Sequence, residues 1–348
     1  MTQQKNMGRM AWADTCRLIA MLGVIIIHVS APVFYSAKSI SLSSFLTATA
    51  LDSIARVAVP LFAMLSGALL LGRDTSGVLA GVMSRLVKVA VPLAFWSVIY
   101  VFWVSYWEGR PLSITGALMQ SLKGPVMYHL WFVYMTMGVY IVLPILQPLS
   151  NALLESKRFA LYFFGVWFLA NSIKVYDHEP ILNQLVLTDF LHWPGYFLLG
   201  FYLSRSAVLK VVPAWCSLIF FGLASATTFF VSWHLNNNAI VPVETAMEYF
   251  SPNVMIASIA AFLLVGKIEL SPKVSKPVTF LSGLVFPVYF MHLLVIELIK
   301  SGMFGFTLDL ASMSSFSAIL ILSLTTFFVS LGIAALTRVI PHSSRLVG

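Results

Sequence analysis

Residues 11–34 read AWADTCRLIAMLGVIIIHVSAPVF, and this stretch decides the fold. It is long and apolar enough for a helix that crosses a bilayer, yet it holds Asp14, Arg17 and His28. At 100° per residue, the 11-residue step from Arg17 to His28 leaves both on one side of the helix, which Asp14 shares. Charges at membrane depth cost a few kcal/mol unless they are paired or wetted, so this face predicts a functional site in a helical bundle. The structural alternative is a snorkelling ion pair at one interface and a histidine at the other.

The composition extends this interpretation to the whole chain. Of its 348 residues, 59% are hydrophobic and 10% are charged, and the mean hydropathy is +0.90. Soluble domains carry about 25% charged residues. We therefore expect one all-α domain over residues 1–348, a polytopic membrane bundle. The first apolar segment has no small-residue cleavage site after a short apolar core, so we expect it to remain as the first helix.

About ten apolar runs have the length of a membrane span, roughly 17–25 residues. They lie near 11–34, 45–71, 82–107, 128–149, 159–174, 185–203, 211–233, 254–269, 278–299 and 315–338. The runs at 159–174 and 254–269 are the shortest of the set.

Lysine and arginine residues predict the orientation of the bundle. With the N-terminus in the cytoplasm, 14 of the 21 fall on the inner side and five on the outer side, while Arg17 and Arg56 lie within the membrane. Cytoplasmic loops are enriched in these residues, so both termini are predicted to be cytoplasmic. The same rule explains the net charge of +8, which therefore does not indicate a nucleic-acid partner. The loops are too short for a soluble catalytic domain, so we expect any chemistry within the bundle.

Polar groups in the second and third spans have two interpretations each. Asp52 and Arg56 are four residues apart and can form an internal ion pair. The Ser-Gly pair at residues 66–67 either allows two helices to pack closely or places a hydroxyl beside a ligand. Arg85 and Lys88 share a helix face at the inner side, where they either follow the positive-inside rule or bind an anionic cytosolic ligand such as a nucleotide cofactor.

Four of the seven histidines fall at the outer ends of four different predicted helices. They are His28, His129, His192 and His292. No compact metal-ligand pattern is present, so we do not expect a metal site. An outward-facing pocket with one histidine as general base is the better interpretation, because a neutral imidazole accepts a proton near neutral pH. The two lone cysteines, Cys16 and Cys216, are expected to be small buried apolar residues.

Five groups of residues together suggest a family. In chain order they are Asp14-x-x-Arg17 with His28, Arg56-Val-Ala-Val-Pro-Leu-Phe with Ser66-Gly67, Arg85-x-x-Lys88, His129-Leu-Trp131-Phe132, and Ser282-Gly283 with Tyr289 and His292. This order resembles acyltransferase family 3, whose members are multi-helix membrane enzymes that acylate extracytoplasmic glycans. The chain's size, without an attached hydrolase-like domain, is most similar to stand-alone O-acetyltransferases of bacterial surface polysaccharides, a group that includes the enterobacterial common antigen O-acetyltransferase.

The resemblance implies roles for matching positions. Arg17 and His28 match the arginine and histidine that the family requires for acyl transfer. Arg85 matches the first arginine of the family's Arg-x-x-Arg motif, whereas Lys88 departs from the second and keeps only its charge. The expected substrate-binding residues are the other matching positions and one further outer histidine: His129, Trp131, Tyr289, His292 and His192.

We therefore expect a membrane O-acetyltransferase in the bacterial inner membrane, which takes acetyl-CoA from the cytoplasm and acylates a lipid-linked glycan. The donor phosphates are expected near Arg85, Lys88 and Arg56. His28 would deprotonate a sugar hydroxyl or first carry the acetyl group itself, while Asp14 fixes Arg17 and Arg17 orients the donor. The acceptor, the choice between acetyl and another short acyl group, and the oligomeric state stay open.

Two other classes of function compete with this expectation. A transporter or flippase of lipid-linked sugars would also have about ten helices and intramembrane charges, although such proteins often show two related halves, and no internal repeat is evident here. A non-catalytic partner in an envelope assembly would have no use for a charged helix face. Acetyl-CoA binding separates the enzyme from both.

Overall fold

The computed structural model describes residues 2–72, 78–109, 115–116, 119, 124–176, 192–238, 242–302, 314–340 and 343–348. Within these residues the chain is helical and contains no β-strand. The elements are α1 (Thr2–Tyr35), α2 (Leu42–Ala55), α3 (Ala58–Leu70), α4 (Val78–Glu108), η1 (Tyr128–Leu130), α6 (Trp131–Glu155), α7 (Lys157–Tyr176), α9 (His192–Arg205), α10 (Val208–Val211), α11 (Ala214–Asn238), η3 (Val243–Met247), α12 (Pro252–Val265), α13 (Pro272–Ser282), α14 (Val285–Lys300), α15 (Phe316–Thr337) and α16 (Ser343–Val347).

The all-helical membrane bundle is confirmed. In the described part of the chain, eight helical stretches are long and apolar enough to cross a membrane, and the bent pair α13–α14 makes a ninth. These nine match nine of the ten predicted spans. The remaining span, 185–203, lies partly outside the described residues, and its described part is α9, a 14-residue helix that is mostly buried. The cytoplasmic placement of the termini stays a prediction.

The span predicted at 45–71 is found as one membrane-length stretch, Leu42–Leu70, with a short break in the helix inside it. It divides into α2 and α3 at Arg56 and Val57. Pro60 lies in the first turn of α3 and has no backbone N–H, so the carbonyl of Arg56, four residues earlier, loses its helical donor. The break places the Arg56 side chain at a bend in the interior of the bundle.

The span predicted at 278–299 is broken in the same way. Here α13 and α14 meet at an angle of 59° across Gly283 and Leu284. Pro287 cannot donate to the Gly283 carbonyl, which instead accepts a hydrogen bond from Arg338 Nη2 at 2.5 Å. A broken helix is tolerated at membrane depth where it lines a cavity or where side chains form hydrogen bonds with its freed backbone groups. The break at Gly283 meets both conditions.

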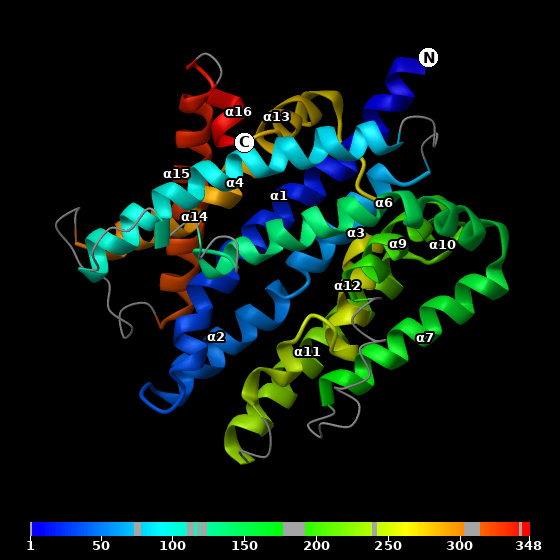
Figure 1. Ribbon diagram of the computed structural model, residues 1–348. Helices are drawn as coiled ribbons and strands as arrows, with labels where there is room; N and C mark the ends of the chain where they lie inside the picture. The colour runs from blue at the N-terminus through cyan, green and yellow to red at the C-terminus, as the bar shows by residue number, and fades with distance from the viewer. Residues whose placement is uncertain are drawn as a thin grey trace.

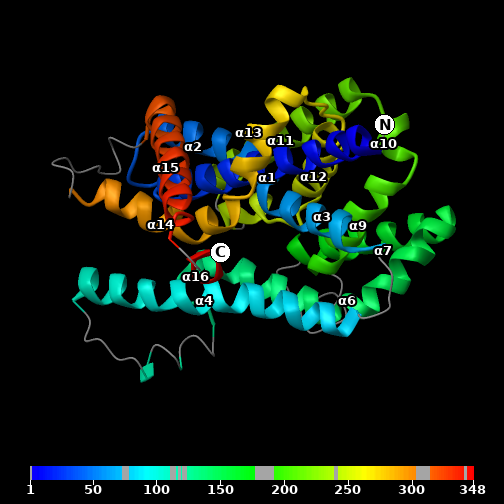
Figure 2. The same ribbon diagram turned by 90° about the horizontal axis from the view of Figure 1, so that it is seen from above.

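Helix α1 is the central helix of the bundle (Figures 1 and 2). It contacts α2, α3, α12, α13, α14 and α15. Helix α4 runs along one side of the molecule, next to α6 and α16, as Figure 2 shows. Because α1 is enclosed, its polar face is directed at other helices rather than at lipid.

Helices α3 and α9 cross with their backbones in close contact. A Cβ atom at Gly67 would lie 1.7 Å from the Phe197 carbonyl oxygen, and one at Gly200 would lie 2.0 Å from the Met64 carbonyl oxygen. Both positions therefore exclude any side chain. The packing role of the Ser-Gly pair at 66–67 is confirmed for its glycine.

Candidate functional site

The polar face of α1 begins with a hydrogen-bonded cluster against α13. Arg17 Nη1 lies 2.6 Å from Asp14 Oδ1, and it also donates to Ser282 Oγ at 3.2 Å. Ser282 Oγ donates to Asp14 Oδ1, and Thr279 Oγ1 donates to Asp14 Oδ2, both at 2.8 Å. Both carboxylate oxygens are thus occupied, and Asp14 fixes the guanidinium of Arg17. Within the described residues only Nη1 of Arg17 is bonded, which leaves Nη2 and Nε available to a ligand.

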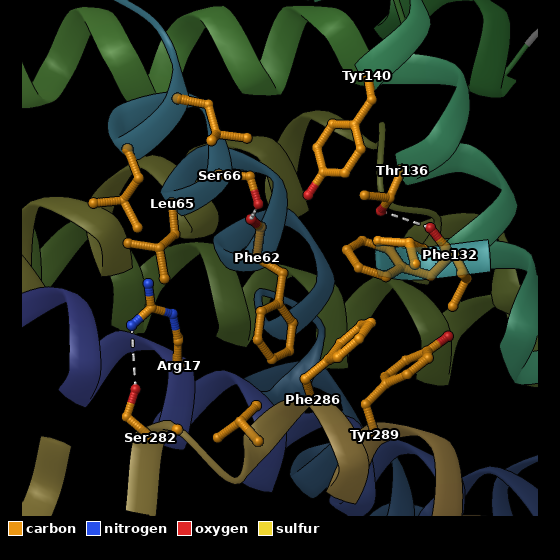
Figure 3. Close-up of a pocket in the computed structure, with 16 residues that line it drawn as sticks. Arg17, Phe62, Leu65, Ser66, Phe132, Thr136, Tyr140, Ser282, Phe286 and Tyr289 are labelled. Atoms are coloured by element: carbon orange, nitrogen blue, oxygen red, sulfur yellow. Dashed lines mark hydrogen bonds between the residues drawn. The ribbon is translucent and has the colours of Figure 1, made fainter. Parts of the chain in front are cut away.

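A cavity of about 420 Å³ opens from this cluster into the bundle. Its lining is largely apolar and comes from α1, α3, α4, α6, α13 and α14. Arg17 and Tyr289 lie on opposite sides of it, with Phe62 and Phe286 between them (Figure 3). The hydroxyl of Ser66 also lines it, so both members of the Ser-Gly pair have a role. Both broken spans contribute walls, which connects the helix breaks to the cavity.

The predicted donor-binding cations do not line this cavity among the described residues. Arg85 is half-buried on α4 and interacts electrostatically with Tyr140, which does line the cavity. Lys88 is exposed on the same helix. Donor binding by these two residues stays a prediction.

Three of the four outer histidines gather into one cluster. The ring centroid of His292 is 5.1 Å from that of His28 and 5.2 Å from that of His129, and His28 and His129 are 6.4 Å apart. His129 and His292 are buried, with 2% and 0% of their surface exposed, whereas His28 is half-buried. His28 is therefore the member that a substrate can reach most easily. Neither ring nitrogen of His129, nor Nε2 of His292, has a hydrogen-bond partner in the described residues.

Tyr289 connects the cavity to the histidine cluster. It lines the cavity, its hydroxyl donates to the backbone carbonyl of His129, and its ring is 5.7 Å from the His129 ring. Its own carbonyl lies 2.6 Å from His292 Nδ1. A carbonyl only accepts, so Nδ1 carries the proton and the lone pair of neutral His292 lies on Nε2. The cluster thus has one imidazole whose tautomer is set by the backbone of the cavity wall.

Arg56 lies elsewhere than predicted for a donor-binding residue. Its Nη2 donates to Asp52 Oδ2 at 2.9 Å and to Met247 Sδ at 3.7 Å, so the predicted ion pair with Asp52 is confirmed. Its guanidinium lies over the ring of Tyr249. The contacts of Arg56 are therefore with Asp52, Met247 and Tyr249, and not with the residues that line the cavity.

His192 stands apart from the other histidines. Its ring stacks on Phe250 at a centroid distance of 4.3 Å, and its carbonyl accepts a hydrogen bond from Trp167 Nε1. Trp131, another of the predicted substrate-binding residues, packs against Trp193, with their ring centroids 5.4 Å apart. Of the four histidines predicted to share one membrane depth, His28, His129 and His292 meet in a cluster and His192 does not.

Several site residues escaped the sequence-based prediction. Thr279 binds Asp14, and Tyr140, Thr136 and Phe286 line the cavity. They are ordinary helix residues with no distinguishing spacing, so only the packing of α6, α13 and α14 around the cavity and the cluster identifies them. In the described part of the chain no group of three or more His, Cys, Asp or Glu residues is arranged to hold a metal ion.

The arrangement places an anchored guanidinium and a largely apolar cavity next to Tyr289, which contacts the histidine cluster. No curated protein sequence and no solved structure matches the chain. A family model described as an acyltransferase domain, that of acyltransferase family 3, matches residues 10–335, nearly the whole chain. The chain belongs to acyltransferase family 3 and is a multi-pass membrane acyltransferase.

Proposed function

We propose that this acyltransferase moves the acetyl group of cytoplasmic acetyl-CoA to a hydroxyl of a lipid-linked surface glycan, at the bacterial inner membrane. Within the family, we place this protein with the stand-alone enzymes, such as the enterobacterial common antigen O-acetyltransferase. The observation that carries the proposal is the cavity from Arg17 to Tyr289, which ends against the histidine cluster.

The cavity suits the pantetheine arm of the donor. A volume of 420 Å³ lies at the lower end of the range of about 300–1,000 Å³ for ligand pockets, so it accommodates the arm better than the whole of CoA. The 11 residues from Arg17 to His28 span about 16 Å of helix. The arm has about twelve bonds along its main chain. An extended chain spans about 3.3–3.6 Å for every three such bonds, so the arm reaches about 14 Å. A donor with its phosphates near Arg85, Lys88 and Arg17 therefore brings its thioester close to His28.

His28 acts on the acceptor in this proposal. In direct transfer, its imidazole takes the proton of the acceptor hydroxyl, the oxygen forms a bond to the acetyl carbonyl carbon, and the carbon–sulfur bond breaks to release CoA as a thiolate, which takes up a proton. The adjacent His292, with a free lone pair on Nε2, is placed to interact with the protonated ring. Prior transfer of the acetyl group to His28 gives the same products.

The test measures O-acetyl groups on surface polysaccharide in cells that carry wild type, His28→Ala or Arg17→Ala at equal membrane abundance. His234→Ala is the matched control, since His234 is an exposed histidine on α11 that is bonded only to Asn238 within the described chain. We expect both site variants to abolish acetylation and the control to retain it. Acetylation that persists in His28→Ala contradicts the general-base assignment.

Binding of radiolabelled acetyl-CoA to the purified protein tests the donor separately. Family membership favours the enzyme over the transporter alternative. A wild-type protein that neither binds acetyl-CoA nor adds acetyl groups would restore that alternative.

A further inference from the structure

We propose that Trp131, Trp193 and Tyr249, together with the Asp52–Arg56 ion pair, form a site for one uncharged sugar ring of the acceptor. These five residues are called the sugar site below. The inference rests on the proposed function, because it assigns a binding site to the acceptor of that reaction.

The three aromatic rings pack on one another. Trp131 and Trp193 are 5.4 Å apart, Trp193 and Tyr249 are 5.7 Å apart, and Trp131 and Tyr249 are 6.0 Å apart, between ring centroids. They come from the first turns of α6 and α9 and from the link between η3 and α12. Each ring is half-buried, so each keeps part of its surface accessible. The electron-rich face of an aromatic ring suits the C–H groups on one face of a pyranose.

An aromatic belt at the membrane interface is the competing explanation, since Trp and Tyr are common there. Belt residues of this chain are far more exposed: Tyr106 keeps 80% of its surface and Trp215 keeps 64%. The three rings of the sugar site instead converge on one another and on a cation inside the bundle. Arg56 Cζ lies 5.8 Å from the centre of the Tyr249 ring.

The ion pair has unused hydrogen-bonding capacity. Asp52 is fully buried and Arg56 retains 9% of its surface, yet Asp52 Oδ1 and Arg56 Nε have no partner in the described residues. One spare acceptor and one spare donor match a hydroxyl group, which donates and accepts at once. The Asp52–Arg56 pair is neutral as a whole, and its guanidinium is enclosed, with 11% of the Arg56 side chain exposed against 31% for Arg17. The pair therefore suits an uncharged group better than a phosphate or carboxylate, and we take an uncharged sugar as the ligand.

The sugar site adjoins the catalytic histidines. Trp131 follows His129 by two residues, and the His129 ring lies 6.4 Å from the His28 ring.

Radiolabelled octyl β-D-glucoside, below its micellar concentration, is the probe, with protein in nanodiscs and empty nanodiscs as background. We expect saturable binding to wild type, weakened about tenfold or more by Trp193→Ala. The double variant Asp52→Asn with Arg56→Gln, which leaves no unpaired charge, should weaken it as well. Trp215→Ala, which removes an exposed tryptophan, should leave it unchanged.

Absence of saturable binding, or binding that both site variants retain, overturns the sugar site. Octyl phosphate that binds as tightly as the glucoside overturns its neutral character. Acetyl-CoA binding to the same samples reports on the proposed function alone. Glucoside binding without acetyl-CoA binding would therefore refute the donor assignment and leave the sugar site standing.

Discussion

The bundle contains two aspartate–arginine pairs that look alike in sequence and differ in environment. Asp14 and Arg17 are three residues apart, and Arg17 keeps 31% of its side-chain surface. Asp52 and Arg56 are four apart, and their side chains keep 0% and 11%. The Asp14 carboxylate has three donors, whereas Asp52 Oδ1 has none within the described residues.

The two pairs therefore differ in role: the Asp14–Arg17 pair fixes a guanidinium in place, and the Asp52–Arg56 pair keeps hydrogen-bonding atoms that a ligand can use. In the first pair, hydroxyl groups of α13 satisfy the carboxylate, and the guanidinium is open to the cavity. In the second pair, the guanidinium is enclosed and both partners retain unmade hydrogen bonds. Unsatisfied buried polar atoms are costly, so they persist where a ligand completes them. Four substitutions test this contrast, taken from the largest expected effect to the smallest.

Asp52→Ala should have the greatest effect on stability. It leaves the buried Arg56 charge without a counter-ion, which costs about 3–5 kcal/mol in free energy of unfolding. Thermal unfolding in detergent micelles measures the loss. Glu297→Ala is the control, because it breaks a half-buried pair with Lys300 whose side chains keep 38% and 24% of their surface, and partly solvated pairs contribute at most about 1 kcal/mol. Equal losses in the two variants would show that the Asp52–Arg56 pair is effectively solvated.

The double variant Asp52→Leu with Arg56→Met should recover most of that stability, since replacing a buried ion pair with apolar residues of similar volume is often neutral or stabilising. Glycan acetylation should nevertheless stay low. A stable double variant with full acetylation would assign the pair a purely structural role.

Asp14→Asn should act mainly on the donor. The amide retains the shape of the carboxylate but no longer holds Arg17 by charge, and hydrogen bonds to charged groups contribute about 1.5–3 kcal/mol. We expect the KM for acetyl-CoA to rise about tenfold or more, with a small change in melting temperature. Steady-state kinetics at varied acetyl-CoA concentration measures both KM and kcat. An unchanged KM with a lowered kcat would show that Arg17 acts in the chemical step and not in donor binding.

Thr279→Val should have the smallest effect. It removes one donor to Asp14 Oδ2 at an exposed position, while Ser282 and Arg17 still bind the other oxygen. The expected loss is about 0.5–1 kcal/mol, with a KM for acetyl-CoA within about threefold of wild type. A loss as large as that of Asp14→Asn would mean that the orientation of the carboxylate depends on Thr279.

Apolar length and loop charge were enough to predict an all-helical membrane bundle and the positions of nine described spans. Helical periodicity correctly grouped Asp14 with Arg17, and the outer positions of His28, His129 and His292 correctly suggested a cluster. The breaks before Pro60 and Pro287 were missed because a proline in the first turn of a helix is compatible with either a kink or a new helix. Arg56 was assigned to the donor because its spacing reveals Asp52 but not the packing of Tyr249, which lies 193 residues further along the chain.

The crossing of α3 and α9 limits how the cavity can move. With Gly67 and Gly200 placing backbone against backbone, no side chain at the contact can change rotamer to let one helix tilt on the other. The facing wall contains the break between α13 and α14, where Arg338 donates to the Gly283 carbonyl and the Leu284 N–H donates to the Leu281 carbonyl. One wall of the cavity is therefore backbone packed on backbone, whereas the shape of the other is set by the angle between α13 and α14.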